Sequence, residues 1–157
     1  MEKIKRIYIY LYSLLLVVID QIIKIVVIKN IQYNPITIIK GILKFSYCEN
    51  KGVAFSIGDG HVPMFIILNI FIIIGMVLFY EKNREEFKGI CKIFFTMVIA
   101  GGVSNLLDRI FRGYVIDFID INDLFSFSIF NVADIFIVCG IIGLLIYMLF
   151  KEGKERK

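Results

Sequence analysis

Four long apolar stretches dominate the pattern of hydrophobic and polar positions along the chain. They cover residues 7–28, 62–80, 90–112 and 129–150, and most charged residues lie between them or at the two ends. A helix needs about 20 predominantly apolar residues to cross the hydrocarbon core of a bilayer. The pattern therefore predicts four transmembrane helices within a single membrane-embedded domain that covers residues 1–157.

The first stretch also has features of a secretory signal peptide, because basic MEKIKR precedes apolar IYIYLYSLLLVVI. No small-residue cleavage site follows, and the apolar run continues through Asp20 to Ile28. We therefore expect an uncleaved membrane anchor.

The loop at residues 29–61 is long enough to have structure of its own. In LKFSYCEN, which begins at Leu43, apolar and polar residues alternate with the period of a strand. Gly58, Asp59 and Gly60 predict a turn before the second helix. The expected fold is an all-α membrane protein with four transmembrane helices and a small extracytoplasmic β platform.

The composition narrows the class of protein and the chemistry. Hydrophobic residues make up 59% of the chain and the mean hydropathy is +0.81, which excludes an ordinary soluble domain and a disordered tail. Cys48, Cys91 and Cys139 form no C-x-x-C pair, and His61 is the single histidine. We expect no metal and no cofactor, so any hydrolytic chemistry would depend on carboxylates.

The basic residues predict the orientation in the membrane. Of the 18 Lys and Arg, eleven lie in three short stretches at the ends of the predicted helices: Lys3, Lys5, Arg6, Lys82, Arg84, Lys88, Lys92, Lys151, Lys154, Arg156 and Lys157. Short loops rich in Lys and Arg stay on the cytoplasmic side. We therefore expect both termini in the cytoplasm and, despite the net charge of +4, no nucleic-acid partner.

Ionisable residues inside a membrane segment are candidates for function, because they are costly to bury there. Asp20 and Lys24 are four residues apart, as in a helical ion pair, and such a pair could also simply orient the helix near the interface. In the third segment one helix face carries small and polar residues, namely Gly101, Ser104, Asn105, Asp108 and Arg112. This face could be a helix–helix packing surface whose polar side chains hydrogen-bond across to a neighbouring helix, although packing alone does not explain Arg109.

Two further acids follow that segment. The chain passes outward at Asp117, reverses over residues 122–128, and re-enters the membrane near Asn131 and Asp134. Alone, Asp134 would be a favourable charge at a helix N-terminus. Two carboxylates at one depth can instead share a proton, so that one activates a water and the other donates a hydrogen bond to the carbonyl under attack.

These segments resemble the bacterial lipoprotein signal peptidases (signal peptidase II) over nearly the whole chain. The similar strings occur in the family's order: DQIIK from Asp20, NKGVAF from Asn50, GGVSNLLDR from Gly101, GYVIDF from Gly113 and FNVAD from Phe130. Each string alone is weakly specific, whereas the ordered set is strongly specific. Ser104 and Val53 depart from the family pattern, since Gly is more usual at the first position and Ala or Gly at the second.

The resemblance implies an aspartic endopeptidase of the bacterial cytoplasmic membrane, with its active site near the outer face. Its substrates would be prolipoproteins that carry a diacylglyceryl cysteine, cleaved just before that cysteine, with membrane lipids around an enzyme that we expect to act as a monomer. By motif position Asp117 and Asp134 match the catalytic pair. The matching supporting residues are Asp20, Lys24, Asn50, Asn105, Asp108, Arg109 and Asn131. Gly52 would suit a loop that closes over the substrate.

Two other functions remain open from the residues. A small proton- or cation-coupled transporter would use the same carboxylates as a relay, with acids near the midplane and internal repeats. In a membrane scaffold the polar residues would only hold the packed helices together by hydrogen bonds.

Overall fold

The computed structural model describes residues 2–52, 61–124 and 129–155. It contains four long helices, α1 (Glu2–Ile31), α2 (Val62–Asn83), α3 (Ile90–Arg112) and α4 (Val132–Glu155). Each contains a segment long and apolar enough to cross a membrane, which confirms the four predicted helices of transmembrane character. The third helix has the predicted bounds, whereas α1 and α2 extend beyond theirs.

The fourth helix begins at Val132, so the predicted start at residue 129 was wrong. Phe130 forms an isolated antiparallel bridge with Ile119, and its carbonyl oxygen accepts hydrogen bonds from the amides of Phe118 and Ile119 at 3.0 and 2.8 Å. A residue whose backbone pairs with a strand cannot also take part in a helical turn. This pairing therefore sets the point at which α4 can begin.

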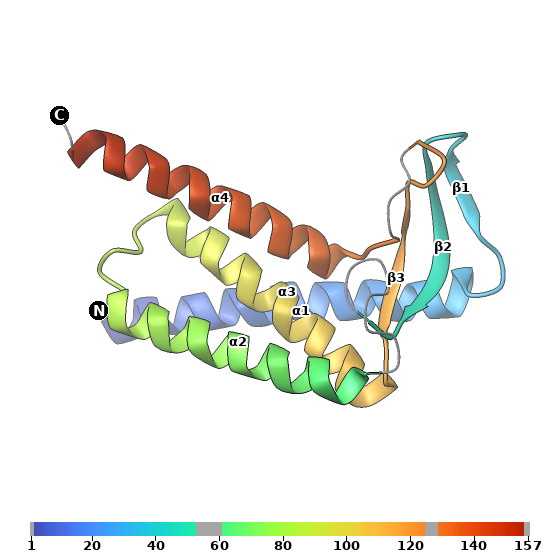
Figure 1. Ribbon diagram of the computed structural model, residues 1–157, viewed down its shortest axis with the longest axis horizontal. Helices are drawn as coiled ribbons and strands as arrows, with labels where there is room; N and C mark the ends of the chain where they lie inside the picture. The colour runs from blue at the N-terminus through green and yellow to red at the C-terminus, as the bar shows by residue number, and fades with distance from the viewer. Residues whose placement is uncertain (1, 53–60, 125–128, 156–157) are drawn as a thin grey trace.

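A three-stranded antiparallel sheet caps one end of the helices, in the order β1 (Ile36–Ile39), β2 (Leu43–Asn50) and β3 (Val115–Asp120) (Figure 1). The alternating LKFSYCEN segment is β2, as predicted. The strand β3 was not predicted, and the turn expected at residues 58–60 lies outside the described residues. In Figure 1 both termini lie at the end of the bundle opposite the sheet.

The sheet is held on the bundle by the last turns of α1. Val27 and Ile31 of that helix form one buried cluster with Ile116 and Phe118 of β3. Because of this contact, β3 runs beside the ends of the helices. The polar residues of helices and sheet can therefore meet at this end of the molecule.

The helix α3 packs closely on α4 through small residues, as the sequence predicted for Gly101. A Cβ atom at Gly101 would overlap the carbonyl oxygen of Ala133. At Gly140 of α4 a Cβ atom would lie 2.7 Å from the carbonyl oxygen of Phe94. The backbones of the two helices thus approach each other too closely for larger residues at these points.

Candidate active site

Asp117 lies on β3, at the end of the helices. The strand β2 shifts its register between Phe45 and Cys48, so that Cys48 pairs with Asp117 and Asn50 with Val115. Asn50 Nδ2 donates a hydrogen bond of 2.9 Å to Asp117 Oδ2. The carboxyl group is almost fully buried, with 2% of the residue exposed.

Asn131 and Asp134 form a reciprocal cap at the start of α4. The Asp134 amide donates to Asn131 Oδ1 at 2.9 Å, and the Asn131 amide donates to Asp134 Oδ2 at 3.1 Å. This is the geometry of a capping box, in which side chains satisfy helical amides that have no other partner. Asn131 Nδ2 also donates to Asp117 Oδ1 at 2.6 Å. The two acids are therefore joined through Asn131.

Asn105 of α3 makes a second connection in the same cluster. Its Nδ2 donates to Asp134 Oδ1 at 2.8 Å. Its Oδ1 accepts from Asn131 Nδ2 at 3.2 Å and from Lys24 Nζ at 3.1 Å. Asn105 thus fixes one oxygen of Asp134 while it is itself held by groups on two other elements. The structure brings together the two acids and the three asparagines that the sequence singled out.

The predicted ion pair of Asp20 and Lys24 is present, at 2.8 Å, but both side chains are fully buried. The interpretation as an ion pair that orients α1 near the interface is therefore too simple. Lys24 Nζ also lies 2.7 Å from Asp108 Oδ2. Asp20 accepts a hydrogen bond from the Ala133 amide at 2.9 Å, and Asp108 accepts one from the Ile116 amide at 3.2 Å. These three residues connect α1 and α3 to the start of α4 and to β3.

The predicted polar face of α3 does contact its neighbours, and one of its partners was missed in the sequence. Gln21 Nε2 donates to Ser104 Oγ at 2.9 Å and to Asp108 Oδ1 at 3.0 Å. Ser104 Oγ donates to Asp20 Oδ2 at 2.6 Å. Arg112 Nη1 donates to Asp108 Oδ1 and, at 3.1 Å, to Gln21 Oε1. A polar Gln21 next to Asp20 in an apolar helix was the available signal.

Arg109, next to Asp108 on α3, contacts a different set of groups from the residues of the polar face. Its Nη2 donates to the Gly52 carbonyl oxygen at 2.8 Å, and its guanidinium lies 5.9 Å from the centre of the Phe65 ring of α2. Asn50 Oδ1 accepts from the Gly52 amide at 3.0 Å. Among the described residues, Arg109 Nε is a buried donor with no hydrogen-bond partner.

The electrostatics of the site favour a proton on Asp117. Burial raises the pKa of this carboxyl to about 7, and the nearby charge of Asp134 acts in the same direction. The hydrogen bonds from Asn50 and Asn131 oppose this shift because they stabilise the ionised form. One carboxyl in this cluster can thus hold a proton at neutral pH.

The donor set does not form a metal centre in the part of the chain that the structure describes. No three His, Cys, Asp or Glu side chains there are grouped as ligands. Asp20 and Asp108, the two acids in contact with Lys24, each already pair with its ammonium group.

A helical membrane fold that holds the buried Asp117 and the half-buried Asp134 in one hydrogen-bonded cluster is suited to a membrane aspartic peptidase. Comparison with known proteins gives the family. The family model described as signal peptidase (SPase) II matches residues 12–150. The chain belongs to the signal peptidase II family.

Curated relatives and solved structures agree with this family. The lipoprotein signal peptidase of Fusobacterium nucleatum is 36% identical over 96% of this chain and 90% of the relative. That of Lactobacillus johnsonii is 34% identical over 99% of this chain and 100% of the relative. A solved bacterial membrane enzyme superposes with a TM-score of 0.84 at 30% identity, over 96% of this chain and 92% of that one. These relatives give no support to a transporter.

Proposed function

We propose that this chain cleaves the signal peptide from lipid-modified prolipoproteins, with Asp117 and Asp134 as its catalytic acids. The observation that carries the proposal is the shared hydrogen bonding of the two carboxyl groups. Asn131 contacts both of them: its side-chain Nδ2 donates to Asp117, and its backbone N–H donates to Asp134. Family membership and the names of the relatives support the peptidase activity.

In the proposed reaction the two acids share one proton. Asp117, with its pKa of about 7, holds the proton and donates a hydrogen bond to the carbonyl oxygen of the scissile amide. Asp134, in its ionised form, removes a proton from water as the water oxygen attacks the carbonyl carbon. The tetrahedral intermediate then collapses and the C–N bond breaks. The proton that Asp134 took from the water passes to the amine of the leaving cysteine, and the acid pair returns to its singly protonated state.

The supporting residues fix this geometry. Asn50 and Asn105 each donate to one oxygen of an acid, at 2.9 and 2.8 Å, and leave other lone pairs for water and substrate. Arg109 has a buried Nε–H that could bind a substrate carbonyl. Because Arg109 also binds the Gly52 carbonyl, we propose that Gly52 belongs to the region that binds the substrate; the rest of the loop that is expected from the sequence to close over the substrate lies outside the described residues.

The position of the acids agrees with a lipid-anchored substrate. They lie on β3 and in the first turn of α4, and these elements are near each other where the sheet caps the helices (Figure 1). Acyl chains could therefore remain in the bilayer while water arrives from the side of the sheet. We propose that this side faces outward from the cytoplasmic membrane, because both termini, with their basic residues, lie at the opposite end. We further propose that residues 1–157 act as one domain and as a monomer.

Cleavage of a diacylglyceryl precursor by the purified protein tests the proposal. Asp117→Asn and Asp134→Asn should each reduce the rate about 10²-fold or more, since each removes one proton-transfer group. Asp123→Asn is the control, because Asp123 is an exposed acid that pairs with Lys44 away from the cluster. The wild-type protein should leave the unlipidated precursor uncut. Near wild-type cleavage by either cluster variant would refute the assignment of the acid pair.

A further inference from the structure

The helix α2 is the least buried of the four spans, yet it carries one buried aromatic ring near the candidate site. Phe65 in its outer turns and Tyr80 near its inner end are its two buried side chains. The Tyr80 ring stacks on Phe95 of α3, with ring centres 5.1 Å apart. The two buried positions are separated by 15 residues, which is about 22 Å along a helix.

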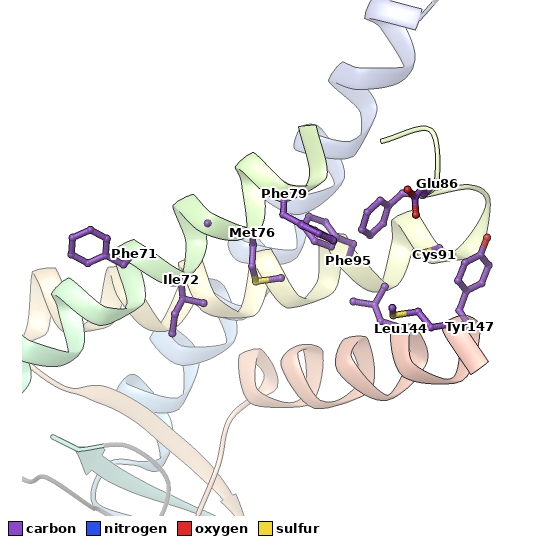
Figure 2. A pocket seen from close by; sticks show the side chains of 12 residues that line it. Phe71, Ile72, Met76, Phe79, Glu86, Cys91, Phe95, Leu144 and Tyr147 are labelled. Atoms are coloured by element: carbon purple, nitrogen blue, oxygen red, sulfur yellow. The ribbon is translucent and has the colours of Figure 1, made fainter. Parts of the chain in front are cut away.

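Between these two positions α2 borders an apolar cavity of about 680 Å³. In Figure 2 the side chain of Met76 projects from α2 into this space, and Leu144 projects into it from α4. A hydrogen bond of 3.2 Å from Asn69 Nδ2 to the Gly102 carbonyl oxygen joins this stretch to α3. The burial of Phe65, at the end of a largely exposed helix, therefore has a local cause.

That cause is the guanidinium group of Arg109 on α3. Its Cζ atom lies over the Phe65 ring, 5.9 Å from the ring centre, within the range of a cation–π interaction. Its Nη2 and Nη1 donate to the carbonyl oxygens of Gly52 and Asn105, at 2.8 and 3.4 Å. In the part of the chain that the structure describes, Arg109 belongs to no ion pair. An aromatic face and carbonyl oxygens therefore meet its positive charge.

This position keeps the guanidinium apart from the two proposed catalytic acids. The charges of Asp134 and Asp117 act on Arg109, and opposite charges attract strongly in surroundings of low dielectric constant. A direct ion pair with either carboxylate would keep that carboxylate ionised and occupy oxygens that water and substrate need. A cation–π contact stabilises a guanidinium without such a pair.

We propose that Phe65 is a positioning residue of the active site, an inference that rests on the proposed function. Its ring holds Arg109 out of an ion pair with Asp117 or Asp134, so that the two acids share their proton and the guanidinium binds the substrate. The helix α2 thereby contributes to the reaction through Arg109.

Ring-fluorinated phenylalanines in place of Phe65 test the proposal, because fluorine withdraws charge from the ring face while the ring keeps nearly its size. The value of kcat/KM for a diacylglyceryl precursor should fall with each added fluorine, by about fivefold for a trifluorinated ring. Phe65→Tyr should stay near wild type. The same fluorinated residues at Phe111, which is 77% exposed on α3, should change nothing. A loss of activity in Phe65→Leu with no response to fluorine would show that the ring only fills space, and would overturn the proposal.

The second test does not require cleavage. A proton above an aromatic face is shifted upfield in NMR spectra, so the Nε–H signal of Arg109 should move downfield in Phe65→Leu and stay unchanged in Phe111→Leu. The signal is identified in detergent by its loss in Arg109→Lys. An unchanged signal in Phe65→Leu would overturn the proposal. If the wild-type protein cleaved no lipidated precursor, the proposed function would fail, while this signal would still decide whether Phe65 holds Arg109.

Discussion

At the scale of single residues, the carboxyl group of Asp117 is under two opposing influences. Its burial and the neighbouring Asp134 favour the protonated form, whereas amide hydrogen bonds favour the ionised form. The resulting pKa of about 7 predicts that kcat/KM falls as the pH rises through this value, because the shared proton is then lost. The titration is a property of the acid pair as a whole.

Asn50→Ala tests this balance. The variant removes a donor that stabilises the ionised carboxylate, so the pKa of Asp117 should rise and the alkaline fall in kcat/KM should move to higher pH. Ser46→Ala is a matched control on the same strand, since its hydroxyl binds Asp120 and not the acid pair. The measurement is a pH profile of precursor cleavage for the three proteins. A shift to lower pH with Asn50→Ala would contradict the assignment.

Ser104 stands where Gly is more usual in the family, and Ser104→Ala removes the hydrogen bond that its hydroxyl makes. Its hydroxyl donates to the fully buried Asp20, and loss of a partner from a buried polar group costs about 1–3 kcal/mol. We expect a fall of this size in the free energy of unfolding, measured by denaturant titration in detergent. Thr96→Ala provides the comparison, because the similarly buried Thr96 hydroxyl donates to the Lys92 carbonyl of its own helix and not to a residue of another element. Equal stability of Ser104→Ala and the wild type would show that the hydroxyl contributes nothing.

Some of the candidate site could be predicted from single residues and some could not. Acids and amides inside apolar segments are conspicuous, so Asp20, Asn105 and Asp134 were recognised from the sequence. Their partners could not be assigned, because they lie far away along the chain: the hydrogen bond from Ser104 to Asp20 joins positions 84 residues apart. The catalytic roles of the acids are still predictions.

At the scale of secondary-structure elements, hydrophobic length predicted the helices but not every strand. The strand β3 is buried along almost its whole length, because it lies between β2 and the helix ends. A strand buried on both faces shows no alternation of apolar and polar residues, and VIDFID therefore was not recognised. The start of α4 was missed for a related reason, since it depends on a long-range pairing of Phe130.

The contact between α3 and α4 can be tested at two adjacent glycines. Gly101→Ala would place a Cβ atom against the Ala133 carbonyl oxygen and should destabilise the protein by about 1–3 kcal/mol, the usual cost of overpacking. At Gly102 the nearest atom, on Ile73, would be 3.6 Å from the Cβ atom, so Gly102→Ala should be tolerated. Thermal unfolding in detergent compares the two. The cleavage rate should also fall in Gly101→Ala, because Ala133 directly precedes Asp134. Equal thermal stability of the two variants would refute the close approach of α3 and α4 at Gly101.

At the scale of the whole molecule, the buried ammonium group of Lys24 connects the helix bundle to the sheet. Lys24 of α1 contacts Asp20 on its own helix, and Asp108 and Asn105 on α3. The carboxylates that it pairs with bind the amides of Ala133 at α4 and Ile116 at β3. The relative positions of α4 and β3, and hence of the two proposed catalytic acids, therefore depend on this charge.

Lys24→Met should consequently affect both stability and activity. It leaves two fully buried carboxylates, one of which keeps only Arg112 as a cationic partner, and loss of one partner from a buried ion pair costs about 3–5 kcal/mol. The free energy of unfolding in detergent should fall by this amount, and the folded fraction should cleave precursor more slowly because the start of α4 loses its anchor. Lys29→Met, at an exposed position in the last turn of the same helix, should change neither quantity. Equal stability of the two variants would show that the ion pairs of Lys24 do not hold the helix bundle and the sheet together.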